Sequence, residues 1–142
     1  MTAEDEPVKV EEANARFYRA FESLDLQEMD GVWAKGEHVR CVHPGWGLLT
    51  GWESVRASWE AIFKNTGEIR FSLTDVRVEV QGSLAWVTCG ENILSQVGGN
   101  ISAATVLATN IFERHGTEWL LIHHHASHVF SGEPPPDSEE TA

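Results

Sequence analysis

The chain has 142 residues, which is a typical length for one domain with one continuous hydrophobic core. Its formal net charge of −12 argues against binding to nucleic acid or to an anionic membrane surface, because both require a basic patch. No apolar run reaches the length of a membrane span and the N-terminus lacks a secretory signal pattern, so we expect a cytoplasmic protein.

Two amphipathic helices are expected at the start of the chain. Apolar residues recur at steps of three and four between Val10 and Leu24, which predicts a helix over residues 5–24. Asp25 and Glu28 have the spacing of a capping box and indicate the start of a second, shorter helix. The apolar residues that this second helix would bury are Met29, Val32 and Trp33.

A short strand and a third helix follow. Residues 39–43 alternate as a strand does, and the proline and glycines of residues 44–47 break the pattern. Thr50 and Glu53 again have capping-box spacing, so a helix of about residues 51–65 is expected after the loop. The two cysteines, Cys41 and Cys89, lie in separate strand-like runs and are expected to be buried free thiols.

The remaining sequence predicts four long strands. The apolar alternation reverses its phase between Leu73 and Val76, which indicates a bulge or bend within the first of them. The later strands, separated by glycine-containing turns, are expected at 84–97, 102–114 and 119–130. The acidic, proline-rich residues 131–142 are expected to form a disordered tail.

The expected order of elements is helix, helix, strand, helix and four strands. Helices that are separate from a meandering sheet are typical of the α+β class. We therefore expect one domain over residues 1–130, with a mostly antiparallel sheet packed on three N-terminal helices.

Two motifs resemble a known superfamily. The first runs from His43 through Trp46 and Gly51 to Trp59, and the second is the histidine-rich segment 119–127. Both are similar to segments of SnoaL-like proteins in the nuclear transport factor 2-like superfamily, and the second also to the closing strand of the calcium/calmodulin-dependent protein kinase II association domain. The resemblance implies a cone-shaped, curved sheet with a small-molecule pocket against the helices, and a homodimer.

Glu91 is the first candidate for catalysis. Counting by twos, it shares a strand face with Val87, Cys89 and Ile93, where a carboxylate is unusual. Burial would raise its pKa and make it a usable general base near neutral pH. The alternative is that a bulge at Gly90, or a position near the strand end, exposes Glu91 to water.

His43 and Tyr18 are the other catalytic candidates. His43 precedes a proline where a strand opens into a loop, so it could transfer protons in a pocket or stabilise the loop. Ketosteroid isomerases are distant relatives that carry an oxyanion-stabilising tyrosine on their first helix, and the resemblance implies this role for Tyr18. The alternative for Tyr18 is a core-edge residue with its hydroxyl in water.

Five residues are candidates for ligand binding. Asn110 follows small neighbours on its strand face, so its amide could orient a ligand or bond the backbone instead. His123 and His125 share one face of the last strand, and a metal held there with His43 is a possibility that we do not favour, because a fuller ligand set is usual. We expect no metal and no cofactor. The five candidates are Asn110, His124, Trp46, Trp59 and His128.

Two classes of function remain open from the sequence. One is a cofactor-free isomerase, dehydratase or cyclase, with Glu91 or His43 as the base acting on a small apolar carbonyl compound. The other is a non-catalytic ligand-binding or dimeric assembly module. A homodimer through the outer face of the sheet is expected, because Trp119 and Leu120 place apolar residues on both faces of the last strand.

Overall fold

The computed structural model describes residues 5–129, and the expected acidic tail at residues 131–142 lies outside them. The described part confirms the α+β class and the order of the main elements. Along the chain these elements are α1 (Glu6–Ser23), α2 (Leu26–Asp30), β1 (Arg40–Val42), β2 (Leu49–Thr50), α3 (Trp52–Asn65), β3 (Glu68–Gln81), β4 (Leu84–Val97), β5 (Asn100–His115) and β6 (Glu118–His128).

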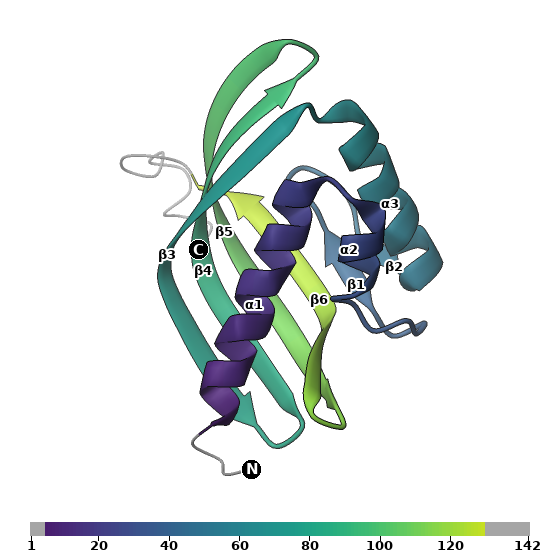
Figure 1. Ribbon diagram of the computed structural model, residues 1–142, viewed down its shortest axis with the longest axis vertical. Coiled ribbons are helices and arrows are strands. Elements are labelled where there is room, and N and C mark those ends of the chain that lie inside the picture. Colours follow the sequence, from purple (N-terminus) through teal and green to yellow (C-terminus); the bar gives the residue numbers. More distant parts are fainter. Residues whose placement is uncertain (1–4, 130–142) are drawn as a thin grey trace, which may run out of the picture.

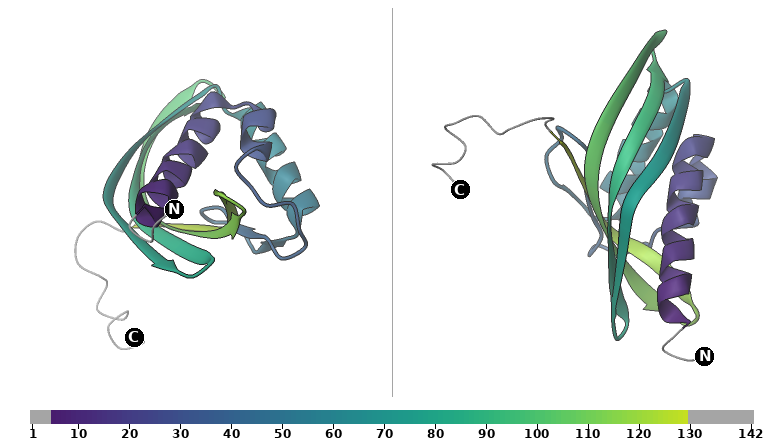
Figure 2. Two further views of the ribbon diagram at one scale, coloured as in Figure 1. Left: turned by 60° about the horizontal axis from the view of Figure 1, so that its bottom comes forward. Right: turned by 90° about the vertical axis from the view of Figure 1, so that its left-hand side faces the viewer.

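The six strands of the described chain form a single sheet in the order β2-β1-β6-β5-β4-β3. All neighbouring pairs are antiparallel except β1 and β6, which run parallel. The sheet is strongly curved, and α1 lies across its concave face, with α2 and α3 beside it (Figures 1 and 2). The long strands can therefore present side chains to α1 from one continuous inner face.

The helix ends differ in part from the predicted caps. The Asp25 side chain accepts a hydrogen bond from the Gln27 backbone N–H at 2.9 Å, but α2 has only five residues, so Val32 and Trp33 are buried beyond its end. The capping box predicted at Thr50 is wrong, because Thr50 belongs to strand β2 and pairs with Arg40 of β1. Gly51 takes the N-cap position instead, with a φ of 86° that favours glycine.

The predicted bulge in β3 is confirmed. The register with β4 shifts between Thr74 and Arg77, and Asp75 has a φ of 54°. This irregularity lies on β3, while Gly90 and Glu91 of β4 stay in regular register with β5. The bulge alternative for Glu91 is therefore wrong.

A second bulge, in β6, reverses the predicted faces of the last strand. Phe112 pairs with Leu121 while Ile111 pairs with His123, so Ile122 is an extra residue. As a result, side chains on both sides of the bulge face the core. The prediction that Trp119 and Leu121 lie on the other face of the strand from Ala126 is wrong. The residues of β6 that are buried together are Trp119, Leu121, His124 and Ala126.

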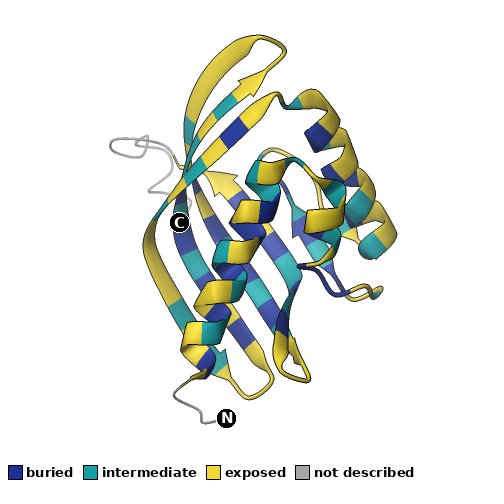
Figure 3. Ribbon diagram, in the orientation of Figure 1, coloured by how far each residue is buried: buried dark blue, intermediate teal, exposed yellow. Residues whose placement is uncertain are grey.

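The core lies between the concave face of the sheet and the helices. Figure 3 shows the buried positions concentrated there, on the inner side of β4–β6 and the facing sides of α1 and α3. The largest fully buried side chains include Trp33, Trp59, Phe17 and Phe112. Cys41 and Cys89 are both buried and free, as expected. None of the helices in residues 5–129 is long and apolar enough to cross a membrane.

Candidate functional site

Glu91 is a buried carboxyl group near the middle of the sheet. It lies on β4 between Leu73 of β3 and Val106 of β5, and only 2% of its surface is exposed. All ten lysines and arginines of the chain are exposed or half-buried, so no buried cation neutralises this carboxylate. Burial raises the pKa of Glu91 to about 7, although the hydrogen bond from Tyr18 opposes the rise.

Tyr18 reaches Glu91 from α1. Its hydroxyl donates a hydrogen bond to Glu91 Oε2 at 2.5 Å and lies 3.6 Å from Cys89 Sγ. The side chain is buried rather than at the edge of the core, so the alternative of a water-exposed hydroxyl is wrong. Burial and the negative charge of Glu91 raise the pKa of Tyr18 well above its ordinary value, so the phenol keeps its proton.

Asn110 and His124 extend this contact into a buried chain of polar groups. Asn110 Nδ2 donates to the Tyr18 hydroxyl at 3.1 Å and to Asn14 Oδ1 at 2.8 Å. Asn110 Oδ1 lies 2.6 Å from His124 Nδ1, across the β5–β6 pairing of these two residues. We call these five residues, Glu91, Tyr18, Asn110, His124 and Asn14, the polar chain.

The directions of the hydrogen bonds in the polar chain follow from donor and acceptor counts. Both hydrogens of the Asn110 amide are used, and its oxygen can only accept, so His124 Nδ1 carries a hydrogen and donates a hydrogen bond to this oxygen. Burial lowers the pKa of His124 well below its ordinary value, so the ring is neutral with a lone pair on Nε2. Within the described residues, this Nε2 makes no hydrogen bond.

His43 lies beside the polar chain, just after β1. Ser58 on α3 donates its hydroxyl to the Val55 carbonyl at 2.6 Å, so it accepts from His43 Nε2, which is 2.9 Å away. Burial lowers the pKa of His43 to about 4, and the ring is neutral at pH 7. Its centroid is 6.3 Å from that of His124.

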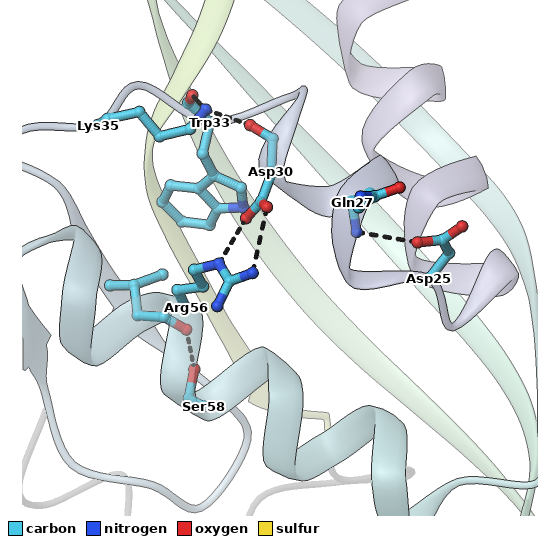
Figure 4. A network of polar contacts seen from close by, with 8 residues as sticks. Asp25, Gln27, Asp30, Trp33, Lys35, Arg56 and Ser58 are labelled. Carbon is cyan, nitrogen blue, oxygen red and sulfur yellow. Dashed lines mark hydrogen bonds and ion pairs between the residues drawn. The ribbon is translucent and has the colours of Figure 1, made fainter.

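An ion pair between helices fixes the part of α3 that carries Ser58. Arg56 Nε donates to Asp30 Oδ1 at 2.9 Å, so α3 is tied to the end of α2, and Figure 4 shows Ser58 on the same helix. Lys35 bonds the backbone carbonyls of Asp30 and Trp33 in the same network. These contacts hold the segment between the helices against α3, and with it the partner of His43.

Aromatic rings enclose the polar chain on the helix side. The Phe17 ring lies 4.9 Å from His124 and 5.8 Å from Trp59, and the Phe71 ring lies 5.1 Å from Tyr18. Trp59 is fully buried, with its ring 4.7 Å from His43 and 6.1 Å from His124. Its indole Nε1 has no hydrogen-bond partner among the described residues.

Small residues separate the two ends of the polar chain on the sheet. Ala108 pairs with Ala126 and with Cys89, between the row that holds Asn110 and the row that holds Glu91. The side chains on the sheet between Glu91 and the Asn110–His124 pair are therefore small.

The candidates from sequence fall into two groups. Tyr18, Glu91, Asn110 and His124 are linked by hydrogen bonds, and His43 and Trp59 lie against them through ring contacts. The other two lie at the periphery. Trp46 is 44% exposed and packs on His43 at 4.9 Å, and His128 is exposed with no hydrogen bond or ring contact to the polar chain within the described residues.

Sequence reasoning missed Asn14 and Ser58. Asn14 was detectable as a polar residue in the apolar stripe of α1, four residues after Val10 and three before Phe17. Ser58 gave no signal, because a serine beside Trp59 is ordinary on a helix. In residues 5–129, no group of three or more histidine, cysteine or acidic side chains is placed to hold a metal ion, and the rings of His123 and His125 are 6.2 Å apart.

Comparison with known proteins identifies the family of the chain. The model of the SnoaL-like domain family matches residues 10–131. The chain belongs to the SnoaL-like domain family. A candidate dehydratase of the nuclear transport factor 2-like family from Streptomyces avermitilis is 42% identical, with a TM-score of 0.86 over 92% of this chain and 100% of that one.

Two further proteins are also similar to this chain. A candidate calcium/calmodulin-dependent protein kinase type II association domain from Thiobacillus denitrificans is 33% identical, with a TM-score of 0.75 over 84% of this chain and 94% of that one. F-box protein SKIP8 of Arabidopsis thaliana is 30% identical over 114 residues, 80% of this chain and 47% of that protein. The chain thus spans about half the length of this curated relative.

Proposed function

We propose that this SnoaL-like protein is a cofactor-free dehydratase that removes water from a small, neutral β-hydroxy carbonyl compound. The observation on which the proposal rests is the buried Glu91 carboxyl group, bonded by Tyr18 at 2.5 Å and paired with no cation. A carboxylate whose pKa is raised to about 7 is matched to proton transfer at neutral pH. The 42% identical candidate dehydratase supports the same reaction class.

Glu91 is a better base than His43. With a pKa near 4, the neutral His43 ring has little tendency to hold a proton at pH 7, and its Nε2 hydrogen is bonded to Ser58. Glu91 Oε1 has no hydrogen bond within the described residues and can receive a proton. His43 is therefore assigned to positioning the aromatic wall.

The substrate is neutral and apolar for electrostatic reasons. Phe17, Trp59 and Phe71 supply an apolar surface beside the polar chain. A substrate carboxylate would face Glu91 without a buried lysine or arginine to neutralise it, which is costly in a site of low dielectric constant.

The reaction balances with the groups of this chain alone. Glu91 takes a proton from the carbon next to the carbonyl, and the electron pair of that C–H bond moves onto the carbonyl oxygen to give an enolate. The enolate then returns the electron pair, a carbon–carbon double bond forms, and the bond from the neighbouring carbon to its hydroxyl breaks. The departing hydroxide takes the proton from Glu91 and leaves as water, so the carboxylate is restored.

Conversion of 4-hydroxypentan-2-one to pent-3-en-2-one, followed by the ultraviolet absorbance of the enone, tests this function. We expect Glu91→Gln to lower the rate by about 10²–10⁴-fold, and the wild-type rate to rise with pH to a plateau above about 7. Glu118→Gln, on the exposed start of β6, is the matched control. A Glu91→Gln rate equal to wild type would reject the base assignment.

A non-catalytic ligand-binding module is the alternative, and the same probe distinguishes it. That alternative predicts a ketone-dependent rise in the thermal midpoint of the wild type without any enone formation. The 33% identical candidate association domain from Thiobacillus denitrificans supports this alternative.

We also propose that two copies pair through the outer face of the sheet. Trp86 of β4 and Leu107 of β5 are 38% and 53% exposed on the face opposite the helices. Leu94 adds a further apolar side chain with 53% exposure. Sedimentation at micromolar concentration is expected to show a dimer for the wild type and a monomer for Leu107→Glu.

A further inference from the structure

The hydrogens of Tyr18, Asn110 and His124 are all used in hydrogen bonds within the polar chain. The single hydroxyl hydrogen of Tyr18 goes to Glu91, and both amide hydrogens of Asn110 go to Tyr18 and Asn14. The Nδ1 hydrogen of His124 goes to Asn110. These three residues therefore leave no donor for a ligand, whereas Glu91 Oε1 and His124 Nε2 are acceptors without a bonded hydrogen. The Asn14 amide interacts with the Cys89 thiol.

His43 offers no free donor either. Its pKa near 4 leaves one ring hydrogen at neutral pH, and that hydrogen is on Nε2, bonded to Ser58. The Ser58 hydroxyl in turn donates to the Val55 carbonyl. Yet a carbonyl oxygen that gains negative charge during proton abstraction needs a donor, and a buried site without one would stabilise the transition state poorly.

A buried hydrogen-bond donor without a partner, the indole N–H of Trp59, lies beside the polar chain. The Nε1–H of Trp59 is buried and has no acceptor in the described chain, a state that costs free energy unless a ligand or water supplies an oxygen. The Trp59 ring lies against both histidines and Phe17. Trp33 Nε1 is the other unpartnered buried donor in residues 5–129, but the Trp33 ring contacts Trp52 and Trp59 and neither histidine.

We infer that the indole N–H of Trp59 is the hydrogen-bond donor that holds the carbonyl oxygen of the substrate. This inference rests on the proposed function for its chemistry, and it names the group that this function leaves unassigned. It also narrows the substrate class to compounds with a neutral carbonyl acceptor, because an alcohol or amine without a carbonyl would leave the donor without a strong acceptor. Tyr18, Asn110 and His124 then act as positioning residues that hold Glu91.

The arrangement separates two tasks. Trp59 on α3 would hold the carbonyl oxygen from the helix side, while Glu91 on β4 acts on the neighbouring carbon from the sheet side. The row of small residues that includes Ala108 and Ala126 lies on the sheet between Glu91 and the Asn110–His124 pair.

The substitution that tests the inference is Trp59→Phe, which removes the N–H and keeps an aromatic ring. With 4-hydroxypentan-2-one we expect kcat to fall by about 10²–10³-fold with little change in KM, as for the loss of one oxyanion donor. Trp33→Phe is the matched control, since it removes another buried and unpartnered N–H from a ring that contacts neither histidine. Equal kcat values for Trp59→Phe and wild type would overturn the inference.

A binding measurement keeps this inference separate from the proposed function. In the ¹H–¹⁵N spectrum of indole groups, pentan-2-one is expected to move the Trp59 resonance downfield in both the wild type and Glu91→Gln, with the resonance assigned by its loss in Trp59→Phe. A shift without any turnover of the hydroxyketone would support the donor and reject the dehydratase. Turnover with an unmoved Trp59 resonance would support the dehydratase and reject the donor.

Discussion

Two buried glutamates, Glu6 and Glu91, have very different surroundings. Glu6, at the start of α1, accepts a hydrogen bond from Trp119 Nε1 at 2.7 Å and lies 3.6 Å from Arg114 Nη1. Glu91 is bonded by the neutral hydroxyl of Tyr18 and has no cation near it. A carboxylate with a charged partner and a fixed donor has a structural role, whereas one held by a single hydroxyl keeps an oxygen available for chemistry.

The largest expected effect concerns the pH dependence of stability. A rise in the pKa of Glu91 from 4.5 to about 7 means that the unfolded chain releases this proton at lower pH than the folded protein, so the free energy of unfolding falls as pH rises from 4.5 to 7. Gln does not titrate. The stability of Glu91→Gln relative to wild type should therefore increase across this window, by about 3 kcal/mol when complete.

Urea unfolding at several pH values measures this difference. Glu118→Gln serves as the exposed control and should show a nearly constant difference from wild type. A constant difference for Glu91→Gln as well would show that burial does not raise the pKa of Glu91.

The next effect concerns the hydrogen bond that holds the start of α1 to β6. Trp119→Phe removes the donor to Glu6 and leaves a carboxylate with 8% exposure dependent on Arg114, so a loss of about 1–3 kcal/mol in the free energy of unfolding is expected. Turnover should stay within a few-fold of wild type. Trp86→Phe, at the 38% exposed position on β4, is the control for changing an indole to a phenyl ring.

The smallest effect is expected for the ion pair itself. Arg114 has 41% side-chain exposure, and solvent screens its attraction to Glu6, so Arg114→Gln should cost at most about 1 kcal/mol. This cost should shrink at high salt, when thermal midpoints are compared at low and high ionic strength. A larger loss that is insensitive to salt would indicate that the contact of Arg114 with the Trp119 ring, at 5.9 Å, matters more than the charge.

Local patterns were sufficient to predict the helices, the hairpins and the bulge in β3. That bulge was visible because the apolar positions change phase between Leu73 and Val76. The bulge in β6 was hidden, because Leu120, Leu121 and Ile122 are all apolar and show no alternation to interrupt. The two-residue strand β2 was also missed, since its pairing with β1 is set by tertiary contacts.

The residue types of the candidate site were predictable, and their connections were not. An acid, an amide and a histidine on apolar strand faces each indicate a special position. Their bonds join residues 73 and 92 positions apart, between α1 and two strands, and no local pattern encodes such contacts. The direction of every hydrogen bond, and therefore the isolation of the Trp59 donor, depends on this three-dimensional arrangement.

The extra residue in β6 has a consequence for comparing relatives by sequence. The extra residue Ile122 determines which face of the sheet each later side chain of β6 occupies, because a shift of one residue moves every side chain to the other face. In a relative that lacks it, the histidine that meets Asn110 would be the neighbour of the one that aligns with His124. Equivalent site residues in such chains are found by counting back from the end of the last strand and not from the columns of a sequence alignment. Two sequences with the same run of histidines can therefore place different histidine rings against the same amide.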